Sequence, residues 1–491
     1  MKSLFLLLPL LLQAASIEVT LDPMLAPQGT SGRLIILMKQ GKPQGDTIRS
    51  GFIPGETWMA AKEVEHFAPG ATVTVDGDDI AFPKLFSQAP AGKWHYMAIL
   101  DVDHSYARNG AGPGDLVSAI ASEPKLTLSH ANPPRPAPTD TDKVKLVEFE
   151  SKLLSQFFGR PVKMQAGVVL PADFAKPGAR YPAIYHVHGF GGDHTFAWRA
   201  KPATAFRAVH IYLNASCEGG HHVFADSANN GPWGAALTQE LIPHLEKQFR
   251  LLPRPSARFL TGHSSGGWST LWLQVAYPKF FGGTWPTAPD SVDFQSFTGI
   301  DVTPGSSQNA YLTKDGQPLY LVRLKGKDVV TLKDFALQER VGGDYGGQFA
   351  SFDWVFSPKG PDGRPMRLFN RLTGEVDPAV REYWRKYDIS YQVQSRWAEL
   401  GPLLKGKIRL VMGDQDTFHL EEATKIFCKF LASKGAEHAC EIIPERDHMD
   451  LFKPYKTYPD GLMKRIEDEM ARQFENGRPK PPQSRPSAPI R

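Results

Sequence analysis

Cysteine is scarce in this chain. Only Cys217, Cys428 and Cys440 occur among 491 residues, and an odd count of three cannot form the disulfide framework of a small secreted domain. Cys428 and Cys440 stand 12 positions apart, across the expected end of a helix and start of a strand. A single bridge between them can form in an oxidising compartment. Two buried thiols are the simpler expectation, and we adopt it here.

Long apolar runs and blocks of charge are also missing. The net charge is +4 and is spread along the chain, with no basic stripe interleaved with aromatics, so nucleic acid is not the expected partner. The one apolar run, residues 4–12, is too short to span a bilayer. It follows a lysine and precedes the small residues Ala14 and Ser16, which predicts a signal peptide over 1–16. No cysteine follows for a lipid anchor, so we expect an exported protein, periplasmic or extracellular, with no integral membrane segment.

A chain of 491 residues exceeds one ordinary domain. Apolar segments at 33–38, 71–75 and 95–102, separated by proline and glycine, predict a small all-β, sandwich-like module over 17–131. Its role stays open between carbohydrate binding and a folding or spacing function. A proline-rich linker is expected at 132–142, and a disordered proline-rich tail at 476–491.

Strands alternate with helices over 143–475, which predicts a mostly parallel sheet with helices on both faces. The expected strands are 162–170, 183–187, 208–213, 257–261, 407–412 and 439–443, and the clearest helices are 235–249 and 420–433. Ligands of such sheets bind beyond the carboxyl ends of the strands. An insertion at 290–400, which leaves the sheet at that edge, is expected to form a lid or wall over the site.

The segment 262–266 reads Gly-His-Ser-Ser-Gly between an expected strand and an expected helix. A serine needs a base to become a nucleophile and must stand where both base and substrate reach it. A sharp strand-to-helix turn achieves this if tiny residues lie two before and two after the serine. Gly262 and Gly266 therefore select Ser264 as the nucleophile, and the amide of Ser265 begins the helix, where it can stabilise an oxyanion.

A histidine base and an orienting carboxylate should follow the serine in the order acid, then histidine. His448 follows the last expected strand and is the candidate base. Asp416 follows the preceding strand and is the candidate acid. Asp414, nearer that strand, and Asp290 and Asp293, after an apparent strand ending at 287–288, remain alternatives, and any of them could merely cap a helix.

A second oxyanion donor is expected in the loop after the strand at 183–187, which reads His-Gly-Phe-Gly-Gly over 188–192. The glycines free the backbone to turn inward, and the amide of Phe190 is the candidate donor. A metal site built from His186, His188 and His194 competes with this interpretation, but no acidic or cysteine ligand accompanies them, so no metal is expected.

Phe352, Trp354 and Phe356 alternate within the insertion and so would share one face of an extended segment. Such a face could stack on a substrate ring, with Trp354 as the substrate-binding residue, or be local core.

Several motifs in this half of the chain carry a family resemblance. They are Tyr181-Pro182 before His188-Gly189, the segment 230–233 leading to 240–243, the elbow 262–267 and the loop 413–416. Over about 151–299 and 400–451 the chain resembles the secreted Putative esterase branch of the α/β-hydrolases, with feruloyl, acetylxylan and enterochelin esterases, S-formylglutathione hydrolase and the mycolyltransferases. The family often has glycine before the histidine, where this chain has Asp447.

The resemblance implies an α/β-hydrolase fold after the β module, and a serine carboxylic-ester hydrolase without metal or organic cofactor. By position, the nucleophile, acid and base fall on Ser264, Asp416 and His448. The expected substrate is a small-molecule or carbohydrate-linked ester. An acyltransferase or peptidase on the same scaffold, or a secreted binding protein without catalysis, are the alternatives.

Overall fold

The computed structural model describes residues 15–477 except 42, 44, 52–55, 106–109, 344–345 and 437–438. The predicted signal peptide lies outside the described residues up to residue 14, and so does the predicted tail from residue 478. The first strand begins at Ser16, one residue before the predicted cleavage point. Within the described part of the chain, no helix has the length and apolar character needed to cross a membrane.

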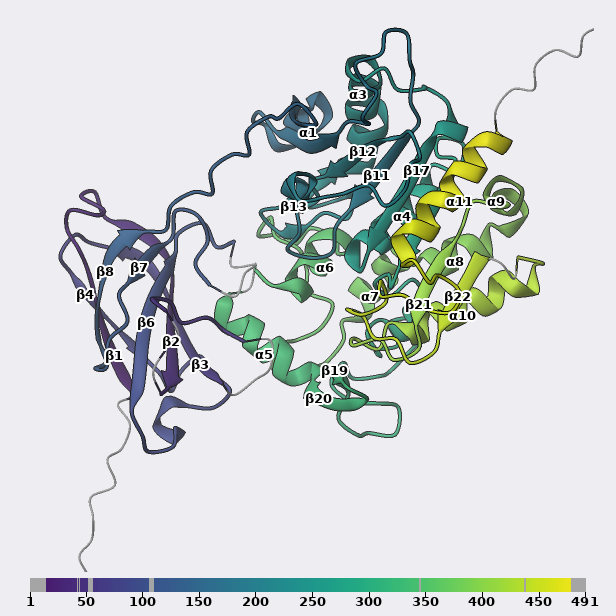
Figure 1. The fold of residues 1–491 in the computed structure, drawn as a ribbon. Coiled ribbons are helices and arrows are strands. Elements are labelled where there is room, and N and C mark those ends of the chain that lie inside the picture. Colours follow the sequence, from purple (N-terminus) through teal and green to yellow (C-terminus); the bar gives the residue numbers. More distant parts are fainter. Residues whose placement is uncertain are drawn as a thin grey trace, which may run out of the picture.

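Eight N-terminal strands form one continuous sheet in the order β4-β1-β8-β7-β6-β2-β3-β5. They are β1 Ser16–Leu21, β2 Thr30–Gln40, β3 Thr57–Phe67, β4 Thr72–Asp76, β5 Ala81–Phe82, β6 Trp94–Asp101, β7 Leu116–Ser118 and β8 Lys125–Ala131. The sheet curls so that strands from both of its ends enclose one core, in which Ile17, Trp58 and Leu126 meet. The predicted strand-rich module is therefore present, and we call β1–β8 the N-terminal module (Figure 1).

A second eight-stranded sheet has the order β22-β21-β18-β17-β11-β12-β10-β9. Its strands are β9 Val144–Glu150, β10 Lys163–Val169, β11 Ala183–Val187, β12 Val209–Leu213, β17 Arg258–His263, β18 Gly283–Thr287, β21 Leu410–Gly413 and β22 Cys440–Ile443. The six strands from β12 to β22 are parallel, and β9 and β10 are antiparallel. The mostly parallel sheet is confirmed, and the six parallel strands end side by side at one edge.

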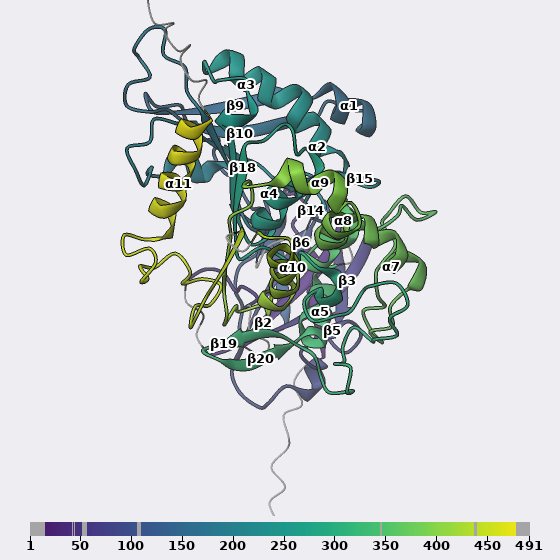
Figure 2. The same cartoon turned by 90° about the vertical axis from the view of Figure 1, so that its right-hand side faces the viewer.

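Helices cover both faces of this sheet, as predicted. The helices of the described chain are α1 Lys152–Phe158, α2 Trp233–Ala236, α3 Ile242–Gln248, α4 Ser265–Ala276, α5 Leu332–Gly342, α6 Gln348–Phe356, α7 Pro378–Trp384, α8 Ile389–Ser395, α9 Trp397–Leu404, α10 Glu421–Ser433 and α11 Leu462–Asn476. In Figure 2, α11 lies on one side of the sheet and α3, α4 and α8 on the other. The insertion also holds a hairpin of β19 Tyr320–Leu324 and β20 Lys327–Thr331.

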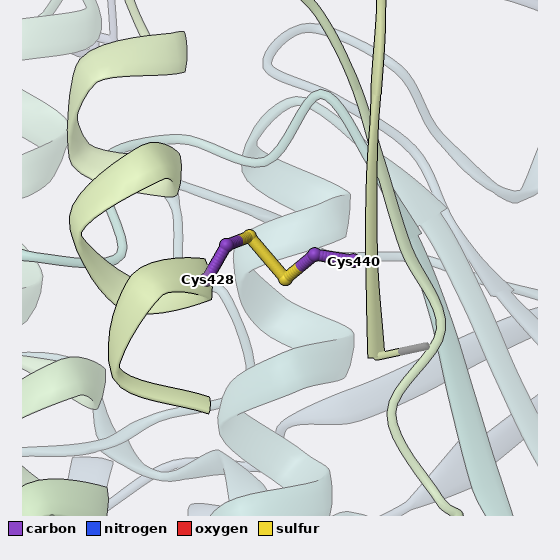
Figure 3. The surroundings of a disulfide bond; sticks show 2 residues. All are labelled: Cys428 and Cys440. Carbon is purple, nitrogen blue, oxygen red and sulfur yellow. A yellow bond between two sulfur atoms is a disulfide. The ribbon is translucent and has the colours of Figure 1, made fainter. Parts of the chain in front are cut away.

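Two expectations need correction. Phe352, Trp354 and Phe356 lie in helix α6 and not in an extended segment. Phe349, Phe352 and Phe356, spaced by three and four residues, reach the buried core, which is the pattern of one helix face. Cys428 of α10 and Cys440 of β22 are bridged, with 5.8 Å between their Cα atoms, and are not two free thiols (Figure 3).

Candidate active site

Ser264 occupies a tight turn between β17 and α4. Its φ of 57° and ψ of −128° lie outside the ordinary regions for an L-residue, which costs about 1–3 kcal/mol. A Cβ added at Gly262 would lie 2.2 Å from the carbonyl oxygen of Gly266. One added at Gly266 would lie 2.0 Å from the carbonyl oxygen of Val187. Both positions therefore require glycine, because any side chain there would force α4 away from the sheet.

His448 and Asp416 meet at the neighbouring strand ends. His448 Nδ1 lies 2.7 Å from Asp416 Oδ2, and both side chains are buried. The second Asp416 oxygen accepts a hydrogen bond of 2.9 Å from the backbone amide of Phe418. Burial by itself would lower the pKa of His448, but the charge and hydrogen bond of Asp416, with the charges of Asp290 and Asp447, raise the pKa above its ordinary value. The imidazolium form of His448 is thus stabilised in place.

The other candidate carboxylates make different contacts. Asp414 accepts a hydrogen bond of 2.7 Å from the amide of Glu445 and so links two loops. Asp293 caps a short 3₁₀ helix by accepting from the amide of Gln295 at 2.9 Å. These are the capping and bracing roles that a loop carboxylate usually has. Neither makes a recorded hydrogen bond to His448 among the described residues.

Asp290, after β18, contacts the turn that holds Ser264. Its carboxylate accepts from Ser265 Oγ at 2.5 Å and from Ser264 Oγ at 3.3 Å, and its amide donates to the Ser264 carbonyl at 3.2 Å. Burial raises the pKa of Asp290 to about 6. The bond from Ser264 is long, and the hydroxyl must rotate away from Asp290 before it can donate to His448.

His263 is a neighbour that the motif analysis did not single out. Its ring lies 4.5 Å from the ring of His448, and its Nδ1 lies 3.1 Å from Thr287 Oγ1. Burial, followed by the nearby charge of His448, lowers the pKa of His263 to about 3. A neutral imidazole therefore packs on the candidate base. Its signal in the sequence is its place in the turn, directly before Ser264.

The loop after β11 packs against Ser264, the candidate nucleophile. A Cβ added at Gly189 would lie 3.0 Å from the Cβ of Ser264, so the backbone approaches that residue closely. Phe190 follows in this loop and lines the same cavity as Ser264. Ser265 opens α4, and the first amides of a helix have no acceptor within it. The amides of Phe190 and Ser265 thus belong to the two segments that flank the Ser264 hydroxyl.

A cavity of about 520 Å³ is lined by Ser264, His263, His448 and Phe190. Residues of the insertion also line it, as expected for a wall: they are Phe335, Gln338, Glu339, Gly347 and Gln348. Trp354 is not among the described residues that line the cavity. Its indole packs instead on Gly219, where an added Cβ would lie 2.6 Å from the ring.

Two histidines of the competing metal hypothesis, His186 and His188, pack against other aromatic side chains. His186 Nε2 lies 3.0 Å from His210 Nδ1, and the ring of His186 stacks on Tyr212 at 4.3 Å. The ring of His188 lies 4.5 Å from that of Phe196. The one described group of three whose ligand atoms all lie within 4.8 Å of one another is elsewhere, in the N-terminal module: Asp101, Asp103 and Asp115.

Comparison with known proteins assigns the chain to a family. Residues 155–448, more than half of the chain, match the model of the family described as Putative esterase. The chain belongs to this family. Its mostly parallel sheet, with helices on both faces, is the fold predicted from the order of its strands and helices. An esterase of Mycobacterium tuberculosis is 28% identical over 120 residues, which are 23% of this chain and 26% of that protein. The chain thus matches only about a quarter of that relative's length.

Solved structures of hydrolases resemble this one at low identity. The fluorophosphonate-binding serine hydrolase FphF of Staphylococcus aureus, substrate bound, is 15% identical and aligns over 67% of this chain and 98% of that chain, with a TM-score of 0.39. An S-formylglutathione hydrolase from Agrobacterium tumefaciens is 14% identical over 67% and 95% of the two chains, with a TM-score of 0.37. A ferulic acid esterase from Anaeromyces mucronatus is 13% identical over 68% and 94%, with a TM-score of 0.33.

Other residues at the cavity escaped the sequence analysis. Phe418 and Met449 directly follow the predicted acid and base loops, and Met59 comes from the N-terminal module. Loop position after Asp416 and His448 could have pointed to the first two. Nothing local in β3 distinguishes Met59 from a core methionine.

Proposed function

We propose that the protein is an exported serine carboxylic-ester hydrolase that forms an acyl-enzyme on Ser264, with His448 as base and Asp416 as orienting acid. The observation that carries the proposal is the 2.7 Å contact between His448 Nδ1 and Asp416 Oδ2, together with the cavity that Ser264 and His448 both line. With Nδ1 held by Asp416, the free Nε2 of His448 is the atom that can accept a proton.

In the first half of the reaction, Ser264 Oγ attacks the ester carbonyl carbon while its proton passes to His448 Nε2. The carbonyl oxygen becomes an oxyanion, for which the amides of Phe190 and Ser265 are the proposed donors. His448 then gives the proton to the departing alcohol, and Ser264 is left acylated. Water repeats the sequence with the same base and releases the acid. An acyltransferase would differ only in the acceptor of this second half.

Export is part of the proposal. The predicted signal peptide at 1–16 supports it, and so does the bridge between Cys428 and Cys440, because disulfides persist in oxidising compartments. The substrate class is a small ester, free or attached to a carbohydrate.

The test is covalent labelling of the purified protein by a fluorophosphonate probe, with the modified peptide identified by mass spectrometry. Ser264→Ala should abolish labelling. Ser265→Ala is the matched control, since it keeps the backbone amide and should still be labelled. The reverse pattern would assign the nucleophile to Ser265 and contradict the proposal. A wild-type protein that is never labelled and hydrolyses no aryl, acetyl or feruloyl ester would instead favour a non-catalytic binding protein.

A further inference from the structure

The N-terminal module shares a hydrophobic core with the insertion. The outer face of its sheet carries buried apolar side chains from β2, β3 and β6, among them Ile35, Met59 and Met97. Val341 of α5 completes this cluster, and Leu337 packs against it. Figure 1 shows α5 between the module and the remainder of the hydrolase. An apolar sheet face must be covered, and here the cover comes from a helix that is far away in the sequence.

Polar contacts fix the position of α5 on the module. Arg33 of β2, which is buried, donates to the carbonyl of Val341 at 2.8 Å and to that of Arg340 at 3.0 Å. These carbonyls belong to the last turn of α5, where they have no partner within the helix and where a cation is favoured. Gln338 Nε2 donates to the carbonyl of Gly51 at 2.9 Å. The module is thus attached at both the end and the middle of α5.

The same helix is linked to the loop after β11, which holds Phe190. Glu339 of α5 accepts hydrogen bonds from the amides of Gln348 and Phe349 at the start of α6. Further along α6, Ser351 approaches Gly220 so closely that an added Cβ there would lie 2.7 Å from the Ser351 Cβ and 3.1 Å from the Phe190 ring. Contacts therefore run without a break from the module through α5 and α6 to the loop that holds the candidate oxyanion donor.

The module also reaches the cavity itself. Ser50, Gly51 and Met59 line it together with Phe335 and Gln338 of α5. We propose that the N-terminal module forms one wall of the catalytic cavity, and that Met59 and the adjoining 50–51 segment contact the far end of the ester bound at Ser264. The wall makes the module a determinant of substrate length. This inference rests on the proposed function of Ser264.

The lining defines the class of ester. Phe335, Phe418 and Met449 present apolar surface, Met59 lies buried in the same lining, and no lysine or arginine is found among the described lining residues. The one carboxylate on the insertion side is Glu339. A volume of about 520 Å³ lies in the range of about 300–1,000 Å³ that suits ligands much larger than an acetyl ester. The cavity therefore fits an extended ester whose longer half is uncharged and largely apolar.

Met59→Ala tests the wall, and Met97→Ala is its matched control. Both methionines are buried in the same cluster, but Met97 is not among the described residues that line the cavity. We would measure kcat/KM for p-nitrophenyl acetate, p-nitrophenyl octanoate and octyl acetate. In Met59→Ala, one of the two long substrates should lose about tenfold relative to the short one, because its far end loses a contact. Met97→Ala should change neither ratio. Equal ratios in the two variants would overturn the proposal.

A second measurement uses the wild-type protein and does not depend on how the variants fold. A long-chain fluorophosphonate with a terminal diazirine is reacted, irradiated and mapped by mass spectrometry. Crosslinks to the peptide that contains Ser50 and Met59 are expected. Labelling at Ser264 with crosslinks confined to hydrolase residues would refute the wall and leave the proposed function standing. Labelling at a residue other than Ser264 would refute the proposed function itself.

Discussion

Asp416→Asn should leave His448 in the wrong tautomer, and the contacts of Asp416 explain this expectation. One carboxylate oxygen accepts from the Phe418 amide at 2.9 Å and the other from His448 Nδ1 at 2.7 Å. Asparagine has a single oxygen, and the Phe418 amide requires an acceptor, so the side-chain amide group would face His448. Nδ1 must then accept a hydrogen bond, and the ring proton moves to Nε2. In that state Nε2 cannot take the proton of Ser264.

The same change in serine proteases lowers kcat by about 10⁴, which corresponds to about 5 kcal/mol of transition-state stabilisation. We expect a loss of this order on an aryl ester, with a thermal melt to check folding. Asp414→Asn is the control: its oxygen would still accept from the Glu445 amide, so kcat should stay within about twofold. A nearly unaffected Asp416→Asn beside a crippled Asp414→Asn or Asp290→Asn would refute the assignment of the acid.

Three further outcomes are expected. Burial raises the pKa of Asp290 from 3.8 to about 6, so this residue's contribution to folding stability is present at low pH and is lost as pH rises through this window. Measured by denaturant unfolding, Asp290→Asn should therefore stabilise the protein by about 2 kcal/mol more near pH 8 than near pH 4. An effect that does not depend on pH would contradict this. Burial raises the pKa of Glu339 to about 7, so this carboxylate becomes charged as pH rises through 7 and should then repel a substrate that carries a carboxylate. The rate of hydrolysis of an aryl hemisuccinate, divided by the rate for the aryl butyrate, should fall about fivefold over this pH range. Glu339→Gln should remove that fall. Because Trp354 packs on Gly219, Trp354→Ala should lower the melting temperature but leave relative kcat/KM unchanged across large and small esters; altered selectivity would return Trp354 to the substrate site.

The parallel sheet and the tight serine turn could be predicted because their causes are local. Gly262 and Gly266 are the residues that a close strand-to-helix turn requires, and the buried strands are short apolar runs between turn residues. The order of strands then brings the loops of Asp416 and His448 to the same edge. Such inferences need only spacing and the geometry of parallel strands.

The features that the sequence did not predict correctly depend on contacts between distant segments. Alternating aromatics at Phe352, Trp354 and Phe356 fit a strand as well as they fit a helix, and only the core that receives Phe352 and Phe356 decides for the helix. The pairing of Cys428 with Cys440 required α10 and β22 to be adjacent, which the spacing alone did not establish. The covering of the module by α5 joins residues about 300 positions apart, as the contact of Arg33 with Val341 illustrates.

The attachment of α5 bears on how this protein can be cut or recombined. A chain that begins at the proline-rich linker would leave Val341 and Leu337 facing water and the carbonyls of Arg340 and Val341 without the guanidinium of Arg33. Such a fragment would expose a new apolar patch, which promotes aggregation. The smallest transferable unit is therefore discontinuous: a chimaera that takes the N-terminal strands from another member of the family must take the matching helix from its insertion as well.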